Sequence, residues 1–259
     1  MIRSFASEWI RFRKTARVGI LVMVGFAALI SLFLFFGDDG FGPGNGGDGG
    51  PLGGAADLTG ENGAVAALST SVNILGVVSL ALFALSVARD FELGTIRNLL
   101  VGQPRRAALL SGKLLAVVSY ITLGVLAAGI VSSVLAVVFA PGQGIPTDGW
   151  TVTASLETWA TTTTAVLLFV IVGAVLAMTT RSAAISITAG VAYLLIVENL
   201  VGLIWDSASE WLPAGVFSAF AAGGTGPLSF EKSAALALGY AIAGLLVMYL
   251  TFAARDVTD

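Results

Sequence analysis

The chain has 259 residues, of which 56% are hydrophobic and only 11% are charged. A soluble domain carries about 25% charged residues, so this composition predicts a helical protein that crosses a membrane several times. The chain has no cysteine, which excludes disulfides and thiolate metal sites, and no histidine, which removes the usual general base and the commonest metal ligand. We therefore expect no enzymatic activity of its own, no metal site and no cofactor bound by this chain.

The first 17 residues predict a basic amphipathic helix. Ile2, Phe5, Trp9 and Phe12 recur at helical spacing, whereas the basic residues of this segment lie mostly elsewhere. Such a helix is expected to lie on the membrane surface, and the alternative is a disordered basic tail. A cleaved signal peptide is disfavoured, because the apolar run that follows is longer than a typical signal core and no small-residue cleavage pattern closes it.

Six apolar segments are long enough to cross a hydrocarbon core of about 30 Å as helices. We therefore expect an all-α fold with one transmembrane domain over residues 1–259. A Gly-rich acidic loop at 37–62 and a segment at 205–232, which predicts short helices in the outer leaflet, lie between spans. The predicted spans are 18–36, 63–87, 114–139, 160–178, 184–204 and 233–254.

The Gly-rich loop contains two weak resemblances to binding motifs. Gly42, Gly44 and Gly47 match the spacing of a dinucleotide-binding loop, but no strand precedes them, so low complexity explains the match better. Its aspartates favour a solvated acidic loop over a cation site. Neither pattern predicts a function.

Basic residues give the orientation in the membrane. Twelve of the thirteen Lys and Arg residues precede the first span, lie between the second and third or the fourth and fifth, or follow the sixth; only Lys232 falls on the other side. The positive-inside rule then predicts that both termini are cytoplasmic. We expect a multi-pass protein of the plasma membrane.

The cytoplasmic stretch 88–113 is the longest polar interruption on this side. Residues 90–100 predict a short amphipathic helix, which Gly102 and Pro104 end, and a second helix is expected to start near Arg105. An ordinary charged intracellular loop is the alternative. Lys113 does not complete a phosphate-binding loop, because Leu114 follows it where a Ser or Thr is required.

This stretch resembles the cytoplasmic loop of type-2 ABC exporter permeases. The resemblance covers the six-span layout of the whole chain, but residue by residue it covers only this loop between the second and third spans. The matching residues are Arg89, Glu92, Gly94, Thr95, Leu99, Leu100, Pro104, Gly112 and Lys113.

The resemblance implies that the loop contains a coupling helix, which docks on a separate ATPase subunit. That subunit would bind ATP and magnesium, and its closure would move the spans. A second permease protomer, identical or different, is also implied. The residues expected to couple to the ATPase are Arg89, Glu92, Gly94, Thr95 and Arg97. An alternative for the basic face is binding of anionic lipid headgroups.

Glu198 is the only carboxylate within a predicted span, and Asn199 is its neighbour. A charge in this position is costly and suggests a function, although pairing with another helix is a structural alternative. A proton-coupled secondary transporter that uses Glu198 is the first rival to an ABC permease, and a non-transporting membrane scaffold is the second. No feature of the sequence selects among a drug, a peptide, a lipid or an ion as substrate.

Overall fold

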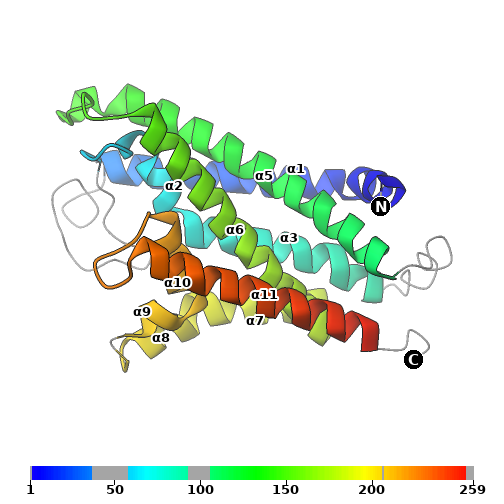
Figure 1. Ribbon diagram of the computed structural model, residues 1–259. Helices are drawn as coiled ribbons and strands as arrows, with labels where there is room; N and C mark the ends of the chain where they lie inside the picture. The colour runs from blue at the N-terminus through cyan, green and yellow to red at the C-terminus, as the bar shows by residue number, and fades with distance from the viewer. Residues whose placement is uncertain (1, 37–57, 93–105, 206, 255–259) are drawn as a thin grey trace.

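The computed structural model describes residues 2–36, 58–92, 106–205 and 207–254 (Figure 1). In these ranges every named element is a helix, which confirms the predicted all-α fold. The long helices are α1 (Ile2–Phe36), α3 (Val72–Glu92), α5 (Arg106–Phe139), α6 (Val152–Thr180) and α11 (Phe230–Ala254). The shorter elements are η1 (Gly63–Val65), α2 (Ala66–Thr70), η2 (Pro141–Gln143), α7 (Ala183–Ala192), the π-helical turn η3 (Tyr193–Val197), α8 (Glu198–Gly202), α9 (Ala208–Trp211) and α10 (Pro213–Ala221).

Five described helices, or six if a bent pair counts as one span, are long and apolar enough to cross a membrane. The bent pair is Gly63–Thr70 with Val72–Ala88, and the two parts meet at 48°. Each of the six predicted spans coincides with one of these helices or with the bent pair, and their crossing of a membrane stays a prediction. The other five candidate spans are Ser7–Phe36, Leu110–Phe139, Val152–Thr180, Ala183–Gly202 and Phe230–Thr251.

Several helices extend beyond their predicted bounds. Residues 2–36 form one helix, so the expected surface helix and the first span are continuous, and the surface position of residues 1–17 stays a prediction. The fourth span begins at Val152 rather than at 160, because Thr151 caps its first turn by accepting a hydrogen bond from the amide of Ala154. Short helices follow the fifth span as expected, namely α9 and α10, and their position in the outer leaflet stays a prediction.

Close packing between α3 and α6 forms the centre of the bundle. The Ser79 hydroxyl donates a hydrogen bond across the interface to the carbonyl of Val166. At Gly173 the two backbones approach so closely that a Cβ atom would lie 2.6 Å from the carbonyl oxygen of Leu80. Small residues permit this approach of helices in membranes. Around this contact Phe83, Phe169 and Phe217 are fully buried.

Figure 1 shows that the start of α1 and the end of α11 lie at the same end of the bundle, as an even number of spans requires. The end of α3 and the start of α5 lie there too, whereas α9 and α10 lie at the opposite end. The cytoplasmic assignment of the first end rests on the charge distribution. It stays a prediction.

Candidate functional site: a buried ionic cluster

Four charged side chains from three helices meet at the end of the bundle that carries the start of α1. They are Glu8 and Arg11 of α1, Asp90 of α3 and Lys113 of α5, and we call them the ionic cluster. The Lys113 ammonium lies 2.7 Å from a carboxylate oxygen of Glu8 and 2.7 Å from one of Asp90. It also donates a hydrogen bond of 3.2 Å to the carbonyl of Ser86, one turn before Asp90. One lysine thereby holds together the ends of three helices.

Arg11 completes the ionic cluster. Its guanidinium nitrogens lie 3.1 Å from the other oxygen of Glu8 and 2.9 Å from the other oxygen of Asp90. Each carboxylate therefore contacts both cations, and two negative charges balance two positive ones. The side chains of Glu8, Asp90 and Lys113 are at most 7% exposed, whereas Arg11 is 47% exposed and closes the solvent side.

The pKa of Asp90 reflects these contacts. Burial alone would raise the pKa of its carboxyl, but the Lys113 ammonium and the Arg11 guanidinium lower it, and the pKa lies below its ordinary value. Asp90 is thus held in its charged form. Buried charges are tolerated when they are paired in this way, and removal of a single member leaves an uncompensated charge.

An aromatic contact next to the ionic cluster also joins α1 to α5. The rings of Trp9 and Tyr120 stack with centroids 3.9 Å apart, and the Tyr120 hydroxyl donates a hydrogen bond to the carbonyl of Trp9. Tyr120 lies seven residues after Lys113 and hence on the same face of α5. The start of α1 is therefore fixed to α5 by both ion pairs and ring stacking.

The predicted coupling residues lie partly outside the described structure. Arg89 and Glu92 belong to the last turn of α3, and the description does not extend to their side chains. Gly94, Thr95 and Arg97 lie outside the described residues, as does most of the helix predicted over 90–100. The helix expected near Arg105 is α5, which begins at Arg106.

Glu198 is buried at the opposite end of the bundle. Its two carboxylate oxygens accept hydrogen bonds of 3.2 and 2.9 Å from the backbone amide of Ala214, in the first turn of α10. A carboxylate at a helix N-terminus pairs with free amides and with the positive end of the helix dipole. Asn199 is exposed and donates to the carbonyl of Leu195 in the preceding turn. These contacts favour the structural alternative for Glu198.

Sequence reasoning missed the ionic cluster, although a signal for it exists. Glu8 and Asp90 are acidic residues on the side of the chain that carries nearly all the basic residues. A buried carboxylate on this basic side of the membrane needs a basic partner, because an unpaired buried charge is costly. Periodicity within one helix does not identify partners that lie 79 or 105 residues away.

Comparison with protein families gives a match over most of the chain. The family model described as "Protein of unknown function (DUF2705)" matches residues 49–258. The match includes Asp90, Lys113 and Glu198, and it begins after Glu8 and Arg11. The comparison with curated proteins found no match.

Proposed function

We propose that this chain, which belongs to the DUF2705 family, is the membrane-spanning permease subunit of an ATP-driven exporter of the type-2 ABC class. One observation carries the proposal: Lys113 and Asp90 form an ion pair at 2.7 Å. This pair connects the beginning and the end of the stretch 88–113, which resembles the coupling loop of these permeases. A rigid connection at this point is what a segment needs in order to transmit force to spans.

The path of transmission follows the ionic cluster. Movement of the coupling residues would act on the end of α3 and the start of α5, which flank them in the chain. Lys113 and Arg11 connect these two helices to α1 through Glu8 and Asp90. The buried contact between α3 and α6, which includes the bond from Ser79 to Val166, would carry the movement further into the bundle.

The proposal includes partners. A separate ATPase subunit binds ATP and magnesium and hydrolyses ATP, because this chain lacks a phosphate-binding loop. A second permease protomer completes the path by which substrate leaves the cell, and the assembly lies in the plasma membrane. The expected contact residues remain Arg89, Glu92, Gly94, Thr95 and Arg97.

Purification of the tagged full-length chain from its native membranes in mild detergent tests this function. We expect an ABC ATPase subunit to co-purify, and ATP hydrolysis by the complex to depend on Glu92 and Gly94. Glu92→Ala and Gly94→Leu should reduce ATPase association, whereas Glu157→Ala, an exposed carboxylate at the other end of the bundle, should not. Absence of the ATPase, or unchanged association and turnover in both variants, would overturn the proposal.

The rival secondary transporter makes a different prediction. It requires transport driven by a proton gradient without ATP and abolished by Glu198→Gln. The backbone amide of Ala214 donates to this carboxylate, and this contact explains the burial of Glu198 without a role in transport. A scaffold without an ATPase partner is the remaining alternative, and the same co-purification separates it from an exporter.

A further inference from the structure

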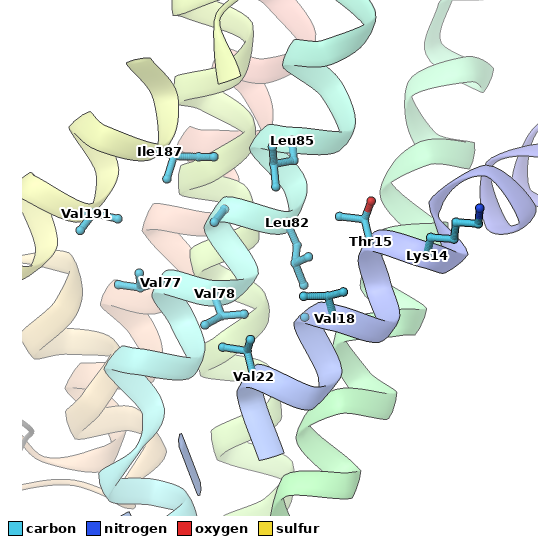
Figure 2. Close-up of a pocket in the computed structure, with 12 residues that line it drawn as sticks. Lys14, Thr15, Val18, Val22, Val77, Val78, Leu82, Leu85, Ile187 and Val191 are labelled. Carbon is cyan, nitrogen blue, oxygen red and sulfur yellow. The ribbon is translucent and has the colours of Figure 1, made fainter. Parts of the chain in front are cut away.

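An open apolar groove of about 590 Å³ lies between α1, α3 and α7 (Figure 2). This volume falls in the range of about 300–1,000 Å³ that is typical of sites for small molecules. At its floor, α1 and α3 touch where Leu82 covers Gly19, and a Cβ atom on Gly19 would lie 2.6 Å from the Leu82 side chain. The walls are formed by Val18, Val22, Val78, Leu82, Ile187 and Val191.

One end of the groove is polar. Lys14 and Thr15 of α1 line it, and Figure 2 shows both on the turn that precedes Val18. Lys14 is exposed, and among the described residues no carboxylate lies within ion-pair distance of it. This differs from Arg11, one turn earlier, whose charge is neutralised by Glu8 and Asp90. The groove therefore joins an apolar channel to a hydroxyl and to a positive charge that no carboxylate of the described residues neutralises.

The length of α1 is consistent with a position of this polar end at the membrane surface, if Phe36, the last described residue of α1, marks the opposite boundary. Its candidate span Ser7–Phe36 has 30 residues, whereas a hydrocarbon core needs about 20. Counted back from Phe36, about 20 residues reach Arg17. Lys14 then lies at the level of the lipid headgroups, and Val18 and Val22 lie at the level of the acyl chains.

We propose that this groove is a binding site for one anionic phospholipid. An acyl chain lies along Val18, Val22 and Leu82, and the headgroup phosphate accepts hydrogen bonds from the Lys14 ammonium and the Thr15 hydroxyl. A basic side chain near the surface attracts anionic lipids, and the adjoining apolar channel adds a fixed position for the chain. A zwitterionic lipid has a cation of its own beside the phosphate and gains less from Lys14. This site does not depend on the proposed transport function.

Native mass spectrometry of the full-length protein in detergent tests the site. The probes are phosphatidylglycerol and phosphatidylcholine with the same acyl chains, titrated separately. We expect the wild-type protein to retain one phosphatidylglycerol more tightly than phosphatidylcholine, and Lys14→Gln to reduce this preference about five-fold. Arg17→Gln, which removes an equal charge one turn along α1 outside the groove lining, is the matched control and should leave the preference unchanged.

A second pair of variants tests the apolar part. Val18→Trp fills the groove and should abolish retention of the tightly bound lipid, whereas Leu21→Trp, at a position 70% exposed that does not line the groove, should not. Equal retention of the two lipids, or equal effects of Lys14→Gln and Arg17→Gln, would overturn the proposal. So would a Val18→Trp protein that keeps its tightly bound lipid, because the acyl chain would then not lie in the groove.

Discussion

The ammonium of Lys113 lies 2.7 Å from a carboxylate oxygen of Asp90, although residues 91–112 separate the two in the chain. The same ammonium lies equally close to Glu8, so the contact joins three helices rather than two. Because Glu8, Asp90 and Lys113 are buried, the loss of one partner leaves a buried charge without full compensation, and the ends of α1, α3 and α5 are joined by these ion pairs.

Removal of Lys113 should therefore be costly. Lys113→Met leaves the carboxylates of Glu8 and Asp90 with Arg11 as their only cation of the ionic cluster. We expect a loss of about 3–5 kcal/mol in the free energy of unfolding, measured by denaturant titration in detergent. The matched control is Lys232→Met, which removes an exposed lysine at the start of α11 and should change stability by less than about 0.5 kcal/mol. Equal losses in the two variants would contradict a structural role for the ionic cluster.

Stability should also depend on Asp90 in acid. Its pKa is lower in the folded protein than the ordinary value of 3.8, so the stabilisation is fully present above pH 3.8 and is lost as the pH falls through the folded value. Asp90→Asn should be less stable than the wild-type protein at pH 7, and the difference should shrink below pH 3.8. Thermal unfolding followed from pH 7 downwards measures this difference, with Glu157→Gln at an exposed carboxylate as the control. A constant difference at all pH values would contradict the ion pairing of Asp90.

Glu198 should act as an acceptor for α10. Glu198→Leu leaves the buried amide of Ala214 without its partner, at a cost of about 1–3 kcal/mol, and hydrogen exchange of the α10 amides should accelerate. Glu198→Gln keeps one acceptor oxygen and should recover most of this protection. Asn199→Leu, at the exposed neighbouring position, should have no effect on α10. If Glu198→Leu leaves exchange in α10 unchanged, the hydrogen bond does not hold this helix.

The packing between α3 and α6 should be destabilised by even one methyl group added at Gly173. Gly173→Ala places its Cβ atom 2.6 Å from the carbonyl oxygen of Leu80, and backbone atoms cannot move aside as a flexible side chain does. We expect a destabilisation of about 1–3 kcal/mol from this overpacking. Gly239→Ala in α11 meets no atom within 4 Å and should be neutral or slightly stabilising, because alanine favours helices. Thermal unfolding of the two variants side by side measures the contrast.

The spans were predictable because a long apolar run reports directly on burial in a membrane. The extension of the fourth span to Val152 was not predicted from hydropathy, since its first turn is polar and depends on the cap by Thr151. The break at Ser71 was also missed, because no proline or glycine marks it. Local sequence therefore identifies the number of apolar spans better than where their helices begin and bend.

The functional candidates were predictable to a lesser degree. Glu198 was recognised as unusual from its position alone, but its partner was not, although Pro213 is a common first residue of a helix and marks the start of α10. The ionic cluster depends on contacts between the first, second and third spans, and their relative rotation is set by packing. The resemblance in residues 88–113 concerns a single loop, so it does not show which faces of the three helices meet.

The 48° bend in the second span has a structural consequence. The amide of Ser71 donates to the carbonyls of Ala67 and Leu68, and its hydroxyl also donates to Leu68, so these backbone groups stay paired at the bend. In a bilayer an unpaired group would cost several kcal/mol. The bend is thus part of the folded structure and not a broken helix end. The second candidate span consists of a short arm, Gly63–Thr70, and a long arm, Val72–Ala88, and the two arms point in different directions.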